Sequence, residues 1–422
     1  MKPGFYTIMA AQFFSSLADN ALLIAAIALL IELSAPEWMK PLLKLFFTVS
    51  YVVLAPFVGA FADSMPKGKV MFITNTIKIA GCALLFFAIH PLLAYAVVGL
   101  GAAAYSPAKY GILTELLPPE RLVAANGWIE GTTVSSIILG TMVGGALISP
   151  AVSGWLLALD FPGFDFAIDS PAESAILVIG VIYGIAALFN LRIPDTGARY
   201  ERQHTNPIKL LADFWHCNTT LWRDKLGQIS LAVTTLFWGA GATLQFIVLH
   251  WARDQLGMQL DKAAILQGIV ALGIAGGAIL AARFVPLKQT PSVLKLGVIM
   301  GLVVPGMTLV SSMGASIPLL VIIGGLAGYF VVPMNALLQH RGHVLLSAGH
   351  SIAVQNFNEN LNILIMLGLY ALLIKFELHV NTIIILFGLF VAGTMALVIR
   401  RYRHSRRNYD LDALIGIEKH HH

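Results

Sequence analysis

Apolar residues fill this chain in long blocks, and the length of those blocks limits the possible folds more than any other feature. A helix needs about 20 mainly apolar residues to cross the hydrocarbon core of a membrane. Twelve segments reach that length: 7–33, 42–63, 69–88, 91–113, 123–149, 172–192, 227–251, 262–282, 293–312, 316–338, 350–374 and 380–400. The sequence therefore predicts an all-α polytopic membrane protein with twelve transmembrane helices.

The composition supports a membrane protein and argues against several other classes. Hydrophobic residues make up 57% of the chain and charged residues 12%, against roughly 25% charged residues in a soluble domain. The net charge of +5 does not indicate a nucleic-acid partner, because basic residues commonly collect at the ends of membrane spans. The two cysteines, Cys82 and Cys217, fit neither a disulfide framework nor a metal site. We expect no metal and no cofactor.

Lysine and arginine are unequally divided between the two sides of the predicted membrane. An even number of crossings places both termini on one side, and the side richer in basic residues is the cytoplasm. With the termini placed there, 21 of the 27 lysines and arginines fall in inside loops and tails, and five fall outside. Lys78 lies within a span. The N- and C-termini are therefore expected to be cytoplasmic.

One long polar segment divides the chain into two sets of six spans. Residues 193–225 are rich in arginine, histidine and asparagine and are predicted to form a cytoplasmic linker. This linker separates an N-terminal six-helix bundle, 1–192, from a C-terminal six-helix bundle, 226–407. Weakly matching motifs in the fourth and tenth spans predict that the two bundles are pseudo-symmetric repeats. The tail, 408–422, ends in three histidines, which indicate a purification tag.

A glycine-containing motif connects the second and third spans. It reads Gly59-Ala60-Phe61-Ala62-Asp63-Ser64-Met65-Pro66-Lys67-Gly68-Lys69 and resembles the signature loop of the major facilitator superfamily. The resemblance implies a gating role, in which glycines permit close helix packing and the aspartate caps a helix and forms a salt bridge to the second half. Those roles would fall to Gly59, Asp63, Gly68 and Lys69. The alternative is an ordinary turn flanked by snorkelling lysines.

Polar side chains recur inside several predicted spans. A charged group at the centre of a span costs at least about 2.5 to 3.5 kcal/mol on insertion scales, so such residues mark candidate functional sites. The first span carries a stripe at helical spacing, made of Gln12, Ser15, Ser16 and Asp19 with Asn20 beside it. The eleventh span repeats the pattern with Gln355, Asn358, Glu359 and Asn362 on one face and Asn356 and Asn360 flanking it.

The candidate substrate-binding residues come from seven spans. They are Asp19, Asn20, Lys78, Lys109, Glu130, Gln245, Asn335, Gln339, Gln355, Asn356, Glu359 and Asn360. Hydrocarbon would not tolerate these groups, so they are expected to face a polar central cavity and to support transport by alternating access. Two alternatives stay open: the amides join helices to one another, and Lys78 neutralises a buried carboxylate such as Glu130.

Four stretches together resemble the bacterial lysophospholipid transporter family of the major facilitator superfamily: 19–23, 101–112, 333–339 and 353–360. The resemblance covers roughly residues 7 to 400. It implies an inner-membrane protein that moves lysophospholipids, mainly lysophosphatidylethanolamine and lysophosphatidylglycerol, to the cytoplasmic leaflet. There an acyltransferase, the expected functional partner, would reacylate them.

The resemblance also implies how a zwitterionic head group would be bound. A carboxylate such as Asp19 or Glu359 would accept hydrogen bonds from the ammonium, and a cationic side chain would bind the phosphate. Relatives often carry an arginine where this chain has Gln245, so Lys109 or Lys78 would have to supply that cation. Lys109 lies near the inside end of its span and could instead snorkel to the interface.

The sequence also bears on two other function classes, an enzyme and a transporter of soluble substrates. The motifs of acyltransferases, zinc and serine hydrolases and ATP-driven pumps are missing from the sequence, so an enzyme is not expected. A proton-coupled exporter or symporter of a small soluble or drug-like substrate remains the alternative, because Asp19, Glu130 and Glu359 could carry protons.

Overall fold

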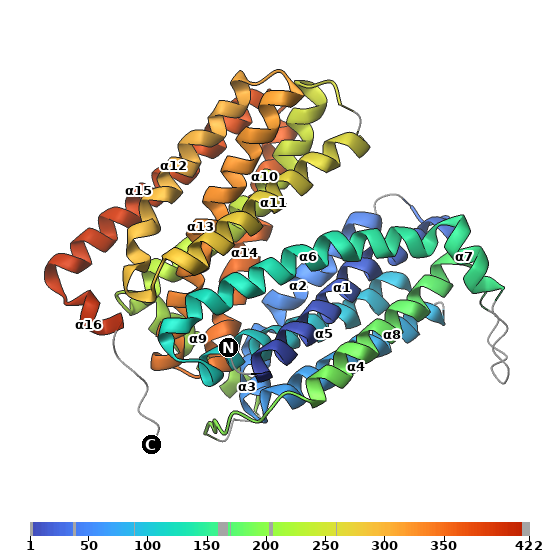
Figure 1. Ribbon diagram of the computed structural model, residues 1–422, viewed down its shortest axis with the longest axis horizontal. Coiled ribbons are helices and arrows are strands. Elements are labelled where there is room, and N and C mark those ends of the chain that lie inside the picture. Colours follow the sequence, from blue (N-terminus) through green and yellow to red (C-terminus); the bar gives the residue numbers. More distant parts are fainter. Residues whose placement is uncertain are drawn as a thin grey trace. The chain divides into compact units, whose positions relative to one another are not determined.

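A computed structural model describes residues 3–36, 39–87, 89–158, 168, 170–201, 206–258 and 260–415. The expected tag, 420–422, lies outside these residues. Every regular element in the described ranges is a helix, as predicted: α1 (Pro3–Glu32), α2 (Met39–Val53), α3 (Ala55–Asp63), α4 (Lys67–Phe86), α5 (Pro91–Leu116), η1 (Pro119–Arg121), α6 (Leu122–Ile148), α7 (Pro150–Leu157), α8 (Pro171–Leu191), α9 (Pro207–Arg223), α10 (Gly227–Asp254), α11 (Leu260–Phe284), η2 (Leu287–Val293), α12 (Leu294–Val303), η3 (Val304–Leu309), α13 (Met313–Leu345), α14 (Ala348–Lys375), α15 (Val380–Asn408) and α16 (Leu411–Ile415) (Figure 1).

The helices reproduce the predicted spans, with one span broken. Within the described residues, eleven helices are long and apolar enough to cross a membrane. The predicted span 42–63 is a bent pair, Leu42–Val53 and Ala55–Asp63, with a 65° angle between its two halves. Pro56 stands in the first turn of α3, where its ring and missing N–H cannot continue the hydrogen bonds of α2. Counted as one span, the pair brings the total to the predicted twelve.

The chain forms two compact units. Unit 1 comprises Met1–Ile112 and Thr132–Leu211, and unit 2 comprises Leu113–Gly131 and Ala212–His422. Helix α6 contributes to both: its residues up to Gly131 belong to unit 2, and the remainder belongs to unit 1.

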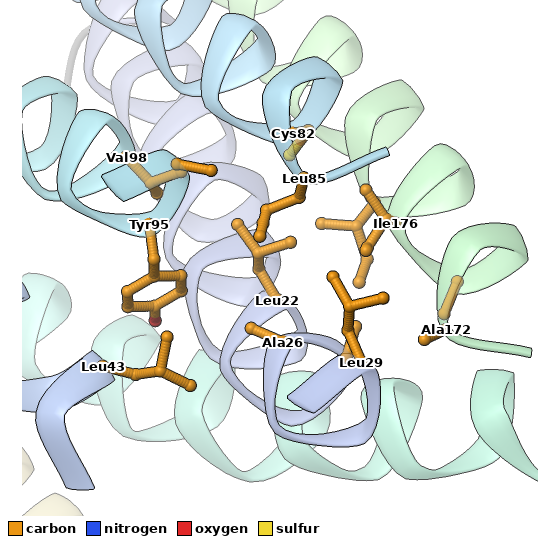
Figure 2. Close-up of a cluster of buried hydrophobic side chains, with 14 of the residues drawn as sticks. Leu22, Ala26, Leu29, Leu43, Cys82, Leu85, Tyr95, Val98, Ala172 and Ile176 are labelled. Carbon is orange, nitrogen blue, oxygen red and sulfur yellow. The ribbon is translucent and has the colours of Figure 1, made fainter. Parts of the chain in front are cut away.

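Unit 1 is built around an apolar cluster that brings α1, α4, α5 and α8 together (Figure 2). Leu22 and Ala26 of α1 pack among Leu85 of α4, Tyr95 of α5 and Ile176 of α8. Small residues on α1 allow this density, because membrane helices associate mainly by close packing and not by exclusion of water. The same helices carry the polar residues of unit 1, so the cluster fixes their positions.

Glycines bring helices of unit 2 into backbone contact. A Cβ atom added at Gly277 of α11 would overlap the carbonyl oxygen of Gly325 in α13, and one at Gly328 would overlap that of Ile274. Helices α12 and α15 approach in the same way, since a Cβ atom at Gly301 would lie 2.5 Å from the Ala392 nitrogen. Small residues at such crossings are the usual means of tight packing in membranes.

The predicted linker contains an amphipathic helix, α9. Its buried residues are Phe214, Asn218 and Leu221, which recur at a spacing of three to four residues and so share one face. The Phe214 ring packs edge-on against Phe357 of α14, with the centroids 5.2 Å apart. The linker segment is therefore attached to α14, one of the helices that carry candidate site residues.

Candidate functional site

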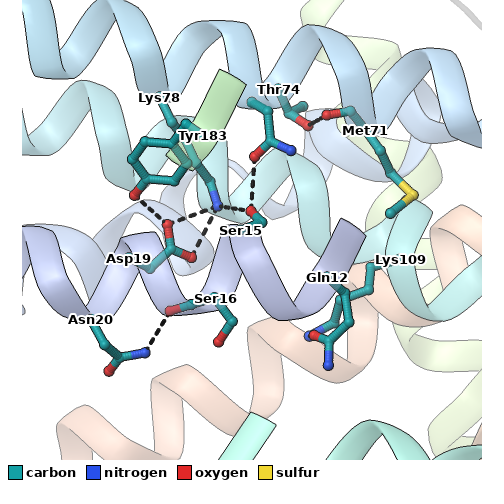
Figure 3. Close-up of polar contacts among 11 residues, drawn as sticks. Gln12, Ser15, Ser16, Asp19, Asn20, Met71, Thr74, Lys78, Lys109 and Tyr183 are labelled. Atoms are coloured by element: carbon teal, nitrogen blue, oxygen red, sulfur yellow. Dashed lines mark hydrogen bonds and ion pairs between the residues drawn. The ribbon is translucent and has the colours of Figure 1, made fainter. Parts of the chain in front are cut away.

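An ion pair joins α4 to α1 within unit 1. The Lys78 ammonium on α4 is 2.9 and 3.0 Å from the two carboxylate oxygens of Asp19 on α1. The Tyr183 hydroxyl of α8 donates to the same carboxylate at 2.6 Å (Figure 3). The Lys78 side chain is 1% exposed and the Asp19 side chain 20% exposed. Three helices thus supply a charged pair and its hydroxyl donor.

The surroundings of Lys78 explain how a cation is tolerated at this depth. Besides Asp19, the ammonium donates to the Ser15 hydroxyl at 3.0 Å, and it lies 4.9 Å from the centre of the Tyr105 ring. Opposite charge, hydrogen bonding and an aromatic face each stabilise a buried ammonium. A Cβ atom at Gly101 would lie only 2.7 Å from Lys78 Cγ. Glycine at that position therefore makes room for the lysine stem.

The ion pair bears on one of the two roles that the sequence left open for Lys78. The lysine pairs with a buried carboxylate, as one alternative predicted, but the partner is Asp19 and not Glu130. Glu130 is also buried, and it belongs to the part of α6 that packs in unit 2. Two residues chosen separately for the site are therefore one neutral pair.

Lys109 of α5 lies inside unit 1 and contacts α1. Its ammonium donates to the side-chain oxygen of Gln12 at 3.2 Å and lies 4.3 Å from the centre of the Tyr110 ring. The Gln12 amide nitrogen in turn donates to Thr132 of α6. Asn20, further along α1, donates to the Ser16 carbonyl of its own helix at 2.8 Å. Lys109 therefore contacts α1 through Gln12.

A second polar cluster lies in unit 2 around Glu359. The Gln355 amide nitrogen donates to Glu359 at 2.8 Å and to the Asn335 side-chain oxygen of α13 at 3.1 Å. All three side chains are buried. Among the described residues of unit 2, no lysine or arginine forms an ion pair with Glu359. The carboxylate is thus hydrogen-bonded by a neutral amide.

The predicted amides Gln339 and Asn360 form different kinds of contact, one between helices and one within a helix. Asn126 and Gln339 exchange reciprocal hydrogen bonds of 2.9 and 3.0 Å between α6 and α13. Both are fully buried, so this pair matches the helix-joining alternative. Asn360 donates to the backbone carbonyl of Asn356 one turn earlier at 2.9 Å. Asn356 itself is buried on α14.

The polar stripe of α14 is divided among several neighbours. Asn358 donates to Asn218 of α9 at 2.9 Å, and its own side-chain oxygen accepts from Trp222 at 3.1 Å. Asn362 donates to the backbone carbonyl of Thr235 in α10 at 2.8 Å. These contacts hold α9 and α10 against α14. Gln355 and Glu359 are the stripe residues whose contacts form the polar cluster.

Gln245 lies on an exposed part of α10 and pairs with Gln267 of α11. Its amide nitrogen donates to the Gln267 side-chain oxygen at 3.0 Å, and Gln267 donates back to the Gln245 backbone carbonyl at 3.1 Å. An uncharged amide at this position cannot replace the charge of an arginine. Gln245 therefore brings no positive charge to this part of α10.

In the expected gating loop, Asp63 ends α3 and pairs with a residue that the sequence did not single out. The Lys67 ammonium is 2.6 Å from Asp63 and donates to the Ala62 carbonyl at 2.7 Å. Gly68 is needed for packing, because a Cβ atom there would lie 2.9 Å from the Asn190 carbonyl oxygen. Gly59 is buried within α3, whereas Lys69 is exposed.

Two contributors, Tyr183 and Tyr105, were missed because tyrosine is common in membrane helices, whereas Ser15 was part of the predicted stripe. Tyr183, Tyr105 and Ser15 surround the Lys78 ammonium. The polar tip of Tyr183 within an otherwise apolar span was the one signal that could have identified it. No group of three or more metal-ligating side chains occurs in the described part of the chain.

Comparisons with known proteins agree with this architecture. The family model of the Major Facilitator Superfamily matches residues 8–367. The chain also resembles solved transporters: a bacterial homologue of the iron transporter ferroportin in its outward-facing state has a TM-score of 0.71, is 14% identical and covers 96% of this chain and 100% of its own. FucP, a Major Facilitator Superfamily transporter in the outward conformation, has a TM-score of 0.70 and is 14% identical. The match covers 95% of this chain and 98% of FucP.

Curated relatives are much closer in sequence. Lysophospholipid transporter LplT of Yersinia enterocolitica is 43% identical over 377 residues, which cover 89% of this chain and 88% of the relative. The protein of the same name from Yersinia pestis strain Pestoides F is 43% identical over 370 residues, covering 87% and 86%. Similarity over nearly the full length of both proteins, together with the helical fold, establishes the family. The chain belongs to the lysophospholipid transporter family of the major facilitator superfamily.

Proposed function

We propose that this chain carries lysophospholipids across the bacterial inner membrane to the cytoplasmic leaflet. The observation that carries the proposal is the 43% identity, over almost the whole chain, with proteins named lysophospholipid transporters. Lysophosphatidylethanolamine and lysophosphatidylglycerol are the proposed substrates. Transport would follow alternating access, the usual mechanism of transporters built from repeated helical bundles.

The polar clusters supply the chemistry that such a head group requires. A phosphate needs cationic or hydrogen-bonding donors, and an ethanolamine ammonium needs a carboxylate. Unit 1 offers Lys109 and the ion pair that Lys78 forms with Asp19. Asp19 is the more exposed member of that pair. Unit 2 offers Glu359, held by Gln355. We assign the phosphate to Lys109 and the ammonium to the carboxylates, with the ion pair opening when substrate binds.

The remaining predicted residues receive secondary roles in this proposal. Asn20, Glu130, Asn335 and the amides Gln339, Asn356 and Asn360 would shape the polar surfaces beside the charged groups. The loop residues Gly59, Asp63, Gly68 and Lys69 would gate the cytoplasmic side. Delivery to the cytoplasmic leaflet would provide an acyltransferase with its substrate, so that enzyme is the proposed functional partner. Both termini would lie in the cytoplasm.

A leaflet assay tests the proposal against the proton-coupled alternative. Labelled lysophosphatidylethanolamine is added to the outer leaflet of vesicles that hold the protein, and albumin extracts whatever label has not crossed. Lipid transport predicts label that albumin cannot extract, with no competition from sugars or cationic drugs. Uptake of a soluble cargo alone, abolished by a proton uncoupler, would replace the lipid assignment with the alternative.

A further inference from the structure

A basic groove lies on unit 2 where α15 runs beyond the start of α12. It has a volume of about 590 Å³. Its lining residues are Val298, Ala396, Ile399, Arg400, Arg403, His404 and Arg407. Neither the ion pair of unit 1 nor the Glu359 cluster contributes to it. The groove is therefore separate from the proposed transport residues.

The groove follows from how the two helices pack. Near the middle of α15 the helices are in close contact, since a Cβ atom at Gly297 would lie 2.8 Å from Met395 and one at Gly301 would lie 2.5 Å from Ala392. This order shows that the helices are antiparallel. Helix α12 begins at Leu294, whereas α15 continues to Asn408. The last turns of α15 therefore extend past the start of α12. The groove lies where α15 extends beyond α12.

Three arginines line up along the extending part of α15. Arg400, Arg403 and Arg407 are separated by three and four residues, so they share one face of the helix. The rise of 1.5 Å per residue spreads them over about 10 Å. Among the described residues, none of the three forms an ion pair with an aspartate or glutamate. The groove therefore carries concentrated positive charge that no carboxylate among the described residues balances.

The apolar end of the groove determines which anion fits. Val298, Ala396 and Ile399 line it on the side toward the membrane-spanning part of the two helices. The guanidinium group of an arginine binds phosphate through two parallel hydrogen bonds. Apolar side chains one turn away suit the first carbons of an acyl chain. A free phosphate would leave that apolar surface unused. Basic pockets beside transmembrane helices on the cytoplasmic side are known to suit anionic lipid head groups.

We propose that this groove binds the phosphodiester head group of an anionic diacyl phospholipid in the cytoplasmic leaflet. Arg400, Arg403 and Arg407 hold the phosphate, and Val298 and Ile399 contact the upper part of the acyl chains. Anionic lipid would thereby anchor α15, next to α12, at a position distinct from that of the transported substrate.

The test measures how tightly the full chain, in neutral detergent, binds dioleoylphosphatidylglycerol by native mass spectrometry. The test variant is Arg403→Gln/Arg407→Gln, and the matched control is Arg401→Gln/Arg406→Gln. The control removes the same charge from the same turns, but from residues outside the groove. We expect the test variant to raise the Kd about tenfold more than the control does. Equal changes in both variants would mean that the arginines only snorkel, and would overturn the site.

Two further measurements identify the ligand and keep the test decisive if the first variant misfolds. Deacylated glycerophosphoglycerol has the same head group without chains and is expected to bind at least about tenfold more weakly. Equal binding of this compound, or of inorganic phosphate, would mean a free-anion site and would overturn the lipid proposal. If the test variant is unstable, Arg403→Lys/Arg407→Lys is used instead. It keeps the positive charge but removes the planar guanidinium group that binds phosphate through two hydrogen bonds. That variant should weaken lipid binding several-fold, and unchanged binding would contradict the assignment.

Discussion

At the residue scale, Lys78 has the most demanding environment in unit 1. Its ammonium is almost fully buried and depends on Asp19, Ser15 and two tyrosine rings. Removing one member of a buried ion pair leaves the other uncompensated, which typically costs about 3 to 5 kcal/mol, whereas removing both is much less harmful. Lys78 and Asp19 are therefore expected to be energetically coupled.

A double-mutant cycle measures that coupling. Asp19→Asn and Lys78→Gln should each lower the thermal unfolding midpoint in detergent, and the double variant should lose at least about 1 kcal/mol less than the sum of the two. Lys295→Gln, at an exposed lysine of α12, is the control and should change little. Strict additivity of the two single effects would show that the pair contributes no coupling.

Glu359 should discriminate between head groups. In Glu359→Gln the side chain keeps its shape and its contact with Gln355 but loses the negative charge that an ammonium requires. Transport of lysophosphatidylethanolamine should fall about tenfold, and transport of lysophosphatidylglycerol, which has no ammonium, should fall much less. The two initial rates are measured in the same vesicle preparation. Equal losses for both lipids would assign Glu359 to the transport cycle and not to head-group recognition.

The sequence identified charged residues inside the predicted spans but was less informative about their partners. A charge inside an apolar block is costly wherever its side chain points, so Asp19, Lys78 and Glu359 could be selected without a structure. The partner of Lys78 depends on how α1, α4 and α8 are rotated, which the sequence does not encode locally. For the same reason, Gln339 could not be assigned in advance to its pairing with Asn126.

At the element scale, the crossing of α11 and α13 gives a sharp packing test. A methyl group at Gly277 would overlap the Gly325 carbonyl, whereas one at the adjacent Gly276 would meet open space. Gly277→Ala should therefore destabilise the protein by about 1 to 3 kcal/mol. Gly276→Ala should be neutral or slightly stabilising, because alanine favours helix over glycine. Thermal unfolding compares the two, and equal midpoints would contradict the described crossing.

Long apolar blocks made the helices predictable, and irregular features were less so. Span ends agreed to within a few residues except where polar turns extended the helix, as in α13 and α15, which continue to Leu345 and Asn408. The break at Leu54 depends on one proline inside an apolar run. Helix α9 was hidden by the polar composition of its segment. The spacing of its buried residues, Phe214 and Leu221 among them, was the available signal.

At the scale of the whole molecule, one ion pair joins several segments of unit 2. Arg341 of α13 forms a two-pronged contact with Asp224, at 2.7 and 3.2 Å, and donates to the Leu414 carbonyl of α16 at 2.9 Å. Burial opposes ionisation of Asp224, but the hydrogen bonds and charge of Arg341 outweigh it and hold the pKa of this carboxyl below its ordinary value. Folding therefore favours the ionised form.

The sign of this shift predicts how stability changes with acid. The stabilisation is fully present above the unfolded pKa of about 3.9 and is lost as the pH falls through the lower folded value. Asp224→Asn should lower the unfolding midpoint by an amount that stays constant between about pH 8 and pH 5 and shrinks below about pH 4. Thermal unfolding across that range checks this. A difference that grows in acid would contradict the shift.

Movement of a lysophospholipid between leaflets is measured by running the leaflet assay on three samples together. These are vesicles with the wild-type chain, vesicles with Asp19→Asn/Glu359→Gln, and vesicles without protein. The predicted result is wild-type transfer of lysophosphatidylethanolamine at least about tenfold faster than without protein, with the double variant close to the protein-free rate. Equal rates in all three samples would contradict the account.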